Sequence, residues 1–144
     1  MKNIKVKFKK LGKDATMPKR VTPGSAGLDL YASKKKTVPT NSTVLIDTDL
    51  AVEIPEGYVG IIKVNSGIAV RDNVTENAGV IDSDYRGHLK VAIANISADP
   101  LKVLKGDRIG QLLIVPCWVG DPEEVEELSS TERGEKGFGQ ASAS

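Results

Sequence analysis

Asn77-Ala78-Gly79-Val80-Ile81-Asp82-Ser83-Asp84-Tyr85-Arg86-Gly87-His88-Leu89-Lys90-Val91 is the stretch that says most about the fold of this chain. Apolar Val80-Ile81 comes directly before Asp82, a glycine closes the turn at Gly87, and a second apolar run starts at Leu89. This pattern predicts a β-hairpin that presents polar side chains at its tip. A carboxylate placed there could act as a general base, although an aspartate in a turn more often caps backbone N–H groups.

Short apolar or β-branched runs of the same kind recur on both sides of this stretch, separated by turns rich in Gly, Pro, Asn and Asp. Many short strands at such spacing are typical of a β-sandwich, a barrel or a jelly roll. The expected strands are 4–8, 43–46, 50–54, 59–64, 79–81, 89–96, 101–103 and 109–119, and one short helix is expected over 66–72. The sequence therefore predicts an all-β fold with little helix.

The composition indicates one domain with a hydrophobic core and no strong overall electrostatic field. Of the 144 residues, 40% are hydrophobic, and 20 Lys and Arg against 19 Asp and Glu leave a net charge of +1, so direct binding to nucleic acid is not expected. Cys117 cannot form an internal disulfide, and neither a signal peptide nor an apolar run of about 18 residues is present. We expect a soluble cytoplasmic protein, or a nuclear or viral intracellular one, with no membrane partner.

The composition changes toward the C-terminus. Five carboxylates lie between residues 121 and 127, and from Ser129 onward nearly every residue is small, charged or glycine. We therefore predict a β domain over residues 1–128 and a polar arm over residues 129–144. On composition alone, such an arm is expected to be a frayed terminus.

Five separated segments, taken together, resemble the signature segments of the trimeric dUTPase family in the same order. They are 25–32 (SAGLDLYA), 64–69 (VNSGIA), 78–91 (AGVIDSDYRGHLKV), 106–113 (GDRIGQLL) and 133–139 (RGEKGFG). The resemblance implies a distorted jelly-roll or β-clip barrel with a flexible C-terminal arm, assembled as a homotrimer. It also implies hydrolysis of dUTP to dUMP and pyrophosphate, which keeps uracil out of DNA and supplies dUMP for dTMP synthesis.

The resemblance assigns the nucleoside end of the site to the third segment. Asp82 is expected to be the catalytic base that activates the water for attack on the α-phosphorus, and also to contact the deoxyribose. Tyr85 is expected to lie against the sugar and to leave no room for a 2′-hydroxyl. Uracil is expected to meet backbone groups of Asn77, Gly79 and Ile81.

The phosphates and the metal are assigned to other segments of the resemblance. Phosphate contacts are expected from Ser66, from the N–H of Gly67, and from Gln111, because a hydroxyl beside a glycine lets backbone N–H groups approach an anion closely. Mg²⁺ is the expected cofactor. Asp29 is expected to hold it through water, with the phosphates as direct ligands, since Mg²⁺ retains much of its hydration.

The resemblance of the fifth segment implies a function for the polar arm. By the resemblance, Arg133 meets the outer phosphates, Phe138 stacks on uracil, and glycines such as Gly139 allow the arm to close over the active site. The arm is expected to reach the site of another subunit, so that three chains share three sites.

The second segment departs from the family pattern. Family members usually carry Pro-Arg-Ser-Ser or Pro-Arg-Ser-Gly, where this chain has Val64-Asn65-Ser66-Gly67. Asn65 is thus an altered phosphate contact, because asparagine lacks the permanent charge and the bidentate geometry of arginine. Lys63 or Arg71 could compensate for this loss, although Lys63 would reach the site only if the loop bends.

Two other functions compete with an active dUTPase. A nucleotide-binding or regulatory protein with the dUTPase fold and weak or lost hydrolysis is suggested by Asn65 and by the altered tail after Gly139. Chemistry of the dCTP deaminase type on the same fold is a further alternative. An active dUTPase is preferred, because Asp82, Tyr85 and Gln111 keep the family pattern.

Overall fold

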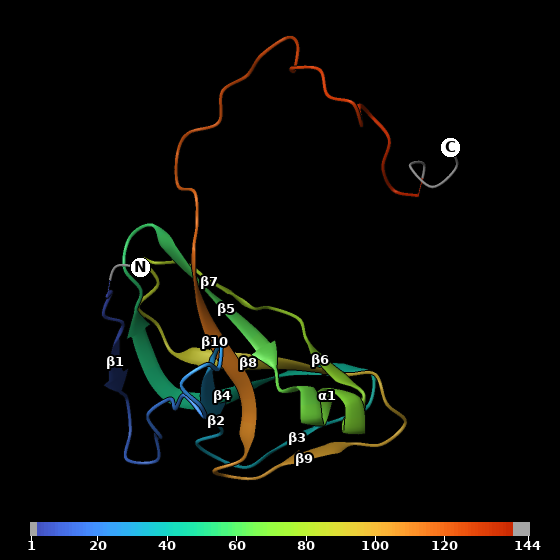
Figure 1. Cartoon of the computed structure of the whole chain (residues 1–144). Coiled ribbons are helices and arrows are strands. Elements are labelled where there is room, and N and C mark those ends of the chain that lie inside the picture. Colours follow the sequence, from blue (N-terminus) through green and yellow to red (C-terminus); the bar gives the residue numbers. More distant parts are fainter. Residues whose placement is uncertain (1–2, 140–144) are drawn as a thin grey trace.

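The computed structural model describes residues 3–139, and within them it consists of β-sheets and one short helix (Figure 1). The elements are β1 (Lys7–Lys10), β2 (Leu28–Tyr31), β3 (Lys36–Val38), β4 (Ser42–Glu53), β5 (Tyr58–Val64), α1 (Ser66–Asp72), β6 (Val74–Glu76), β7 (Val80–Ile81), β8 (Leu89–Asn95), β9 (Leu101–Val103) and β10 (Arg108–Pro116). The prediction of an all-β fold with little helix is confirmed.

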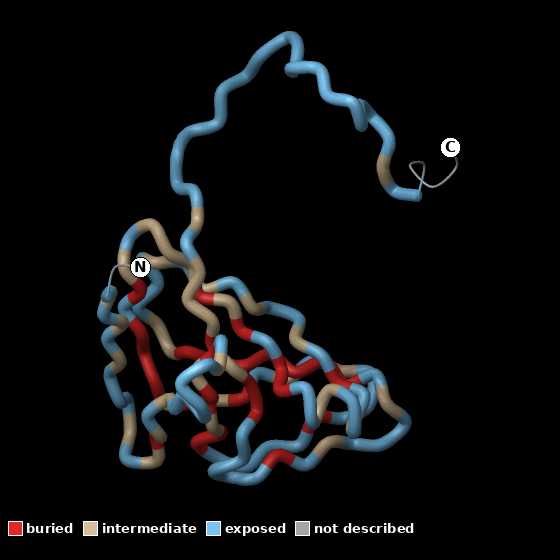
Figure 2. The backbone as a smooth tube through the Cα atoms, viewed as in Figure 1, coloured by how far each residue is buried: buried red, intermediate tan, exposed pale blue. Residues whose placement is uncertain are grey.

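The strands form two four-stranded sheets and one two-stranded sheet. The first sheet has the order β1-β4-β8-β6, the second β2-β10-β5-β7, and β3 pairs with β9. Aliphatic side chains from both larger sheets form one core, which appears in Figure 2 as the buried stretches of the strands. The largest fully buried members are Leu30, Ile46, Leu50, Ile54, Ile62, Leu89, Ile93, Ile109 and Leu112. Burying each such side chain stabilises the fold by about 1.5–3 kcal/mol.

β4 is one continuous strand where two strands, 43–46 and 50–54, were expected. Its pairing with β8 shifts register between Asp47 and Leu50, and Asp49 there has a φ of 56°. Such a bulge breaks the alternation of apolar and polar residues, which is why the sequence pattern looks like two strands. Thr48, which is fully buried at the bulge, accepts the N–H of Leu50 and donates to the carbonyl of the facing strand.

The strands on either side of Asp82 do not pair with each other, so the prediction of a β-hairpin is wrong. β7 pairs with β5, where Ile81 faces Gly60, whereas β8 pairs with β4 and β6. The turn over residues 82–88 therefore crosses from one sheet to the other. Two apolar runs joined by a turn do not specify which strands they pair with. Here each run packs into a different sheet, and this packing determines its pairing. The polar tip itself is present, because Asp82 and Tyr85 are both exposed.

Three strands were not expected from the sequence, namely β2, β3 and β6. Each has only three or four residues, which is too short for a clear alternation. The helix was expected over the residues that α1 occupies, and it ends at Asn73, which has the left-handed φ of 51° common at helix ends. Within residues 3–139, no helix has the length and apolar character needed to cross a membrane.

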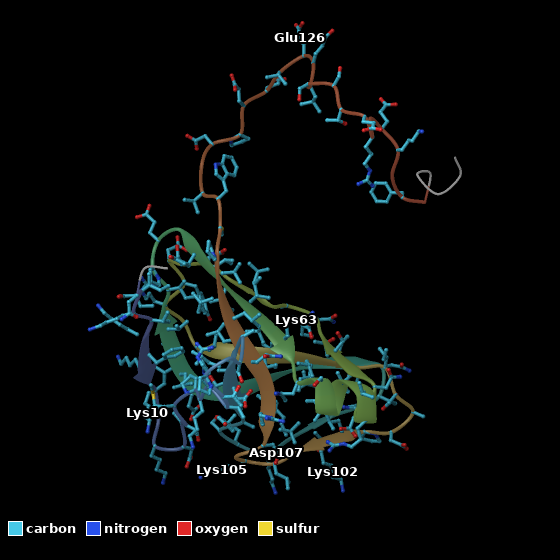
Figure 3. All side chains as sticks on the ribbon, in the orientation of Figure 1. Lys10, Lys63, Lys102, Lys105, Asp107 and Glu126 are labelled. Carbon is cyan, nitrogen blue, oxygen red and sulfur yellow. The ribbon has the colours of Figure 1, made fainter. Side chains whose placement is uncertain are left out.

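The chain leaves the sheets after Pro116, earlier than the boundary after residue 128 that the composition suggests. Residues 118–136 are all exposed, and Figures 1 and 2 show this arm running away from the barrel. Glu126, labelled in Figure 3, lies far from every strand. Residues 140–144 of the predicted arm lie outside the described residues.

One buried polar residue fastens the end of β8. Asn95 is 1% exposed, and its Nδ2 donates to the carbonyls of Val38 at 3.0 Å and Asp99 at 2.9 Å. Its Oδ1 accepts the N–H of Ser97 at 2.9 Å. These bonds hold the connection to β9 against the end of β3.

Replacing Asn95 should therefore destabilise the fold. Asn95→Ala leaves backbone groups unpaired inside the protein, and we expect the free energy of unfolding in urea to fall by roughly 2 to 4 kcal/mol. Asn3→Ala, at an exposed asparagine before β1, is the matched control and should change it by less than about 0.5 kcal/mol. Equal effects of the two substitutions would contradict this account.

Candidate functional site

A cavity of about 250 Å³ lies beside the turn over residues 82–88, and we name it the turn cavity. Both larger sheets contribute to its wall. Its lining residues are Leu45, Ala78, Val80, Ile81, Asp82, Tyr85, His88, Lys90 and Ala92. An aliphatic wall with a carboxylate, a phenol, an imidazole and an ammonium group suits a small ring that carries polar substituents.

The turn is held by its own hydrogen bonds. The N–H of Tyr85 donates to the carbonyl of Asp82 at 3.1 Å, and the Tyr85 hydroxyl donates to the carbonyl of His88 at 2.8 Å. A Cβ added at Gly87 would come within 2.5–2.8 Å of the Tyr85 ring, so only glycine lets the ring lie this close to the backbone. The phenol of Tyr85 thus has a fixed position at the edge of the turn cavity.

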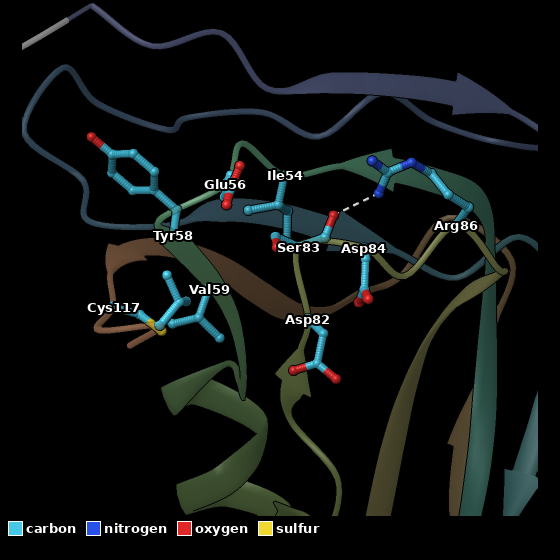
Figure 4. A pocket seen from close by; sticks show the side chains of 10 residues that line it. Ile54, Glu56, Tyr58, Val59, Asp82, Ser83, Asp84, Arg86 and Cys117 are labelled. Atoms are coloured by element: carbon cyan, nitrogen blue, oxygen red, sulfur yellow. Dashed lines mark hydrogen bonds between the residues drawn. The ribbon is translucent and has the colours of Figure 1, made fainter. Parts of the chain in front are cut away.

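Asp82 borders the turn cavity and also a larger cavity of about 590 Å³ on the other side of the turn (Figure 4). Figure 4 shows Ser83, Asp84 and Arg86 following it along the turn, with Arg86 donating to the Ser83 carbonyl at 2.6 Å. Within residues 3–139, no hydrogen bond or ion pair occupies the carboxylate of Asp82. That carboxylate is free to accept a proton or a hydroxyl hydrogen bond from a bound molecule.

Of the three residues expected beside uracil, only Ile81 lines the turn cavity. The side chain of Asn77 donates to Thr43 Oγ1 at 2.6 Å, and the carbonyl of Gly79 accepts the N–H of Ile62 at 2.7 Å. These groups of Asn77 and Gly79 are thus engaged within the chain.

A separate cavity of about 290 Å³ lies beside α1, β9 and the start of β10, and we name it the cationic cavity. It is lined by Asn65, Gly67, Ile68, Arg71, Leu101, Lys102, Val103, Asp107, Arg108 and Ile109. Three cationic side chains and one carboxylate line the cavity, and two of these cations also pair with carboxylates outside the lining, Arg71 with Asp72 and Arg108 with Asp29. The excess of cations in the lining itself favours an anionic ligand. Figure 3 labels Lys102 and Asp107 at this end of the barrel. A Cβ added at Gly67 would meet nothing within 4 Å, so the space in front of Gly67 is open.

Asn65 lines this cavity, and its side-chain acceptor receives no hydrogen bond from the described residues. The residue is 7% exposed, and its buried Oδ1 has no partner among residues 3–139. Its side chain does not cap α1, although it precedes the helix directly. Ser66, the first residue of α1, is exposed and does not line the cationic cavity.

Of the two cations that could replace the missing arginine, the structure brings only Arg71 to the cationic cavity. Lys63, labelled on β5 in Figure 3, instead forms an ion pair with Glu76 of β6. Glu76 also accepts the N–H of Val64 at 3.0 Å. Burial opposes the ionisation of Glu76, but the hydrogen bonds from Lys63 and Val64 outweigh it and lower the pKa of this carboxyl.

Asp29 is connected to the cationic cavity through Arg108. The carboxylate of Asp29 is almost buried, and Arg108 donates to its Oδ2 at 3.3 Å. Gln111 faces Asp29 in the pairing of β10 with β2, and a Cβ added at Gly27 would meet Gln111 Oε1 at 2.7 Å. Within residues 3–139, no three His, Cys, Asp or Glu side chains form a group that could hold a metal ion.

The expected residues of the fifth segment lie on the arm, away from both cavities. Arg133 donates to the carbonyl of Lys136 at 2.7 Å, and Phe138 is fully exposed with a φ of 49°. Gly139, with a φ of 90°, follows at the end of the described residues. None of these residues lines the turn cavity or the cationic cavity.

Sequence reasoning did not select Lys102, Arg108 or His88 as site residues. Arg108 lies in the fourth segment directly before the buried Ile109. A charged residue at the start of a core strand is a sequence feature that could have identified Arg108 as a site residue. Lys102 belongs to a short strand without any motif, and nothing in the sequence shows that this strand reaches α1. Only the folded chain brings them to the two cavities.

Comparison with protein families gives a match over nearly the whole chain. The model of the dUTPase family matches residues 13–142. A relative from Rattus norvegicus, a deoxyuridine 5'-triphosphate nucleotidohydrolase, is 40% identical over 134 residues. The alignment covers 93% of this chain and 65% of that protein.

Solved structures of phage proteins have the same fold. A mutant dUTPase of Staphylococcus bacteriophage 80alpha with dUpNHpp superposes with a TM-score of 0.90 at 32% identity, covering 95% of this chain and 98% of that one. A mutant dUTPase from phage phi11 of S. aureus, which coordinates a structural Mg(II) ion, gives 0.83 at 27% identity, covering 88% of this chain and 100% of that one. The fold predicted from the sequence resemblance is confirmed.

The Glu76 contacts support a prediction about pH. A carboxyl whose pKa is lowered by folding stabilises the protein above its unfolded-state pKa, and this contribution is lost as the pH falls through the folded-state pKa. Glu76→Gln should lower the free energy of unfolding in urea by about 1.5–3 kcal/mol at about pH 7, and the deficit should shrink toward about pH 3. Glu53→Gln, which removes exposed ion pairs with Lys7 and Arg86, should have little effect at any pH. A deficit for Glu76→Gln that does not change with pH would show that the charge is unimportant.

Proposed function

Since the chain belongs to the dUTPase family, we propose that it hydrolyses dUTP to dUMP and pyrophosphate. The observation that carries this proposal is the turn cavity, where the unpaired carboxylate of Asp82 and the fixed ring of Tyr85 lie on one wall. A nucleoside bound in this cavity places its sugar next to both groups.

Asp82 is the proposed base. Its carboxylate accepts a proton from a water molecule as the oxygen of that water attacks the α-phosphorus. The bond from the α-phosphorus to the bridging oxygen breaks, and pyrophosphate leaves with the bridging oxygen. The exposed, unpaired state of Asp82 suits this task, because no partner within the described residues competes for the carboxylate.

Tyr85 is the proposed filter for deoxyribose. Two features keep its ring in place, the hydrogen bond to the His88 carbonyl and the close approach that Gly87 allows. A ring that cannot move aside excludes a 2′-hydroxyl by steric overlap. The aliphatic side of the turn cavity, which includes Ile81, is the proposed place for the pyrimidine.

The cationic cavity is the proposed place for the phosphates. Arg71, Lys102 and Arg108 line it, and the open space at Gly67 leaves room for an anion near the backbone. Ser66 and Gln111 are proposed as additional phosphate contacts, since each can donate a hydrogen bond from a polar side chain. Arg71, which pairs with its neighbour Asp72 at 2.7 Å, lines the cationic cavity, whereas Lys63 does not. Arg71 is therefore the proposed replacement for the arginine that Asn65 displaces.

Mg²⁺ is the proposed cofactor, held mainly by oxygens of the triphosphate. Such binding does not require a cluster of protein ligands, because Mg²⁺ usually keeps several waters and takes its remaining ligands from substrate phosphates. The ion neutralises phosphate charge and fixes the shape of the triphosphate. Asp29 is the proposed contact through water, since Arg108 occupies Oδ2 and leaves Oδ1 to accept from a water molecule.

A homotrimer with shared sites is proposed because one chain presents the required groups in separate places. The turn cavity and the cationic cavity have no lining residue in common, and the arm runs away from both (Figure 1). Under three-fold symmetry, one copy supplies Asp82 and Tyr85, a second supplies the phosphate contacts, and a third supplies Arg133, Phe138 and Gly139 from its arm. The arm would then close over the bound nucleotide.

The direct test measures pyrophosphate release from dUTP, dCTP, dTTP and UTP, with Mg²⁺ and with a chelator. We expect turnover of dUTP that depends on Mg²⁺ and little turnover of the other three. Asp82→Asn should abolish hydrolysis and retain nucleotide binding, because it removes the proton acceptor while keeping the shape of the side chain. Binding of dUTP without turnover would favour the regulatory role, and ammonia release from dCTP would favour a deaminase.

The second segment gives a separate test of the phosphate site. Asn65→Arg should raise kcat/KM for dUTP by about 10-fold or more, since a charged contact is added where phosphate charge develops. Arg71→Ala should lower kcat/KM in the natural chain and have a smaller effect when combined with Asn65→Arg.

Lys63→Ala is the control for these variants, because its ammonium group is turned to Glu76, and turnover should not change. If Lys63→Ala reduces kcat/KM as much as Arg71→Ala does, Arg71 is not the replacement cation.

A further inference from the structure

The imidazole of His88 accepts a backbone N–H that the bulge in β4 leaves without a strand partner. The N–H of Asp49 donates to His88 Nε2 at 2.9 Å. Asp49 lies within the register shift and has a φ of 56°, so its N–H is not part of the ladder with β8. A buried backbone donor without an acceptor is costly, and His88 supplies this acceptor from the neighbouring strand end.

The same residue is tied to the active-site turn through its main chain. Its carbonyl accepts the Tyr85 hydroxyl at 2.8 Å, which is the bond that holds the phenol at the turn cavity. The next residue, Leu89, is fully buried and pairs with Leu50 in β4. The ring of His88 therefore connects the bulge of β4 to the end of the turn, at the point where the turn meets β8.

We propose that His88 is a positioning residue that sets the selectivity for the sugar. By accepting the N–H of Asp49, its ring keeps the His88 carbonyl where it fixes the Tyr85 phenol. His88 acts through Tyr85 and does not touch the reacting atoms. This inference rests on the proposed function, because it assumes that the turn cavity holds a deoxynucleotide.

The bond between Asp49 and His88 depends on the protonation of the imidazole. A neutral imidazole can accept at Nε2, whereas the protonated ring donates from both nitrogens and cannot accept the N–H of Asp49. The charged groups facing the ring are the Asp49 carboxylate on β4, whose Oδ1 is 3.6 Å from Nε2, Lys90 on β8, and Asp82 on the turn. Only a side chain with an available acceptor at this position can make the bond that the structure shows.

Two substitutions distinguish the effect of the hydrogen-bond acceptor of His88 from the effects of its size and its charge. His88→Phe keeps a ring and removes the acceptor, whereas His88→Gln keeps an acceptor at a similar position and cannot be protonated. For His88→Phe we expect KM for dUTP to rise and the preference for dUTP over UTP to fall, each by about 3- to 10-fold, with kcat nearly unchanged. His88→Gln should match the natural chain in KM and in the preference for dUTP over UTP, because it retains an acceptor for the N–H of Asp49.

Ser42→Ala is the matched control, because it removes a side-chain hydrogen bond to a backbone carbonyl at the start of β4, outside both cavities. It should leave KM and sugar preference unchanged. An unchanged sugar preference in His88→Phe, or a loss of that preference in His88→Gln as large as in His88→Phe, would overturn the proposal.

Hydrogen exchange of the Asp49 amide tests the connection without any turnover. The amide should exchange slowly in the natural chain and in His88→Gln, and about 10-fold faster or more in His88→Phe. Equal exchange in all three proteins would overturn the role of His88. If the natural chain fails to hydrolyse dUTP, the proposed function fails. The exchange rates and the relative binding of dUTP and UTP to the three proteins then still decide whether His88 positions Tyr85.

Discussion

The placement of β8 in a different sheet from β7 determines where the turn over residues 82–88 lies. Six of its seven residues are buried, because it packs between β4 and β6 and faces the core of both larger sheets. Its start, Leu89, is fixed by the pairing with Leu50, while the preceding strand β7 is held in the other sheet by β5. The turn over residues 82–88 has to cross from the sheet that contains β7 to the sheet that contains β8. Because of this constraint, the Asp82 carboxylate is exposed next to the Tyr85 ring.

The bulge in β4 is the second consequence of this packing. Its two extra residues, Thr48 and Asp49, open the ladder with β8. The hydroxyl of Thr48 and the imidazole of His88 accept the backbone N–H groups of Leu50 and Asp49. A feature that interrupts a sheet thereby fixes the end of the turn over residues 82–88. Bulges are often found next to active sites because they redirect one side chain while the rest of the strand stays paired.

The charges of the molecule are divided in a way that the near-neutral total does not reveal. The unpaired carboxylate of Asp82 lies at the turn cavity, whereas Arg71, Lys102 and Arg108 gather at the cationic cavity. A nucleoside triphosphate needs both kinds of surface, one for the sugar and the attacking water and one for the phosphates. In the proposed homotrimer, neighbouring copies would bring the two surfaces to one ligand.

The sequence by itself determined the all-β class, the family, the helix after β5 and the polar tip at Asp82, because each of these depends on local residue types or on motifs in a fixed order. It did not determine that β7 and β8 join different sheets, that β4 is continuous through a bulge, or that Lys63 turns to Glu76 while Arg71 lines the cationic cavity. Those outcomes depend on which distant strands pair and which side chains the core leaves exposed. Alternation along a strand carries no information about its partner, so the tertiary structure decided them.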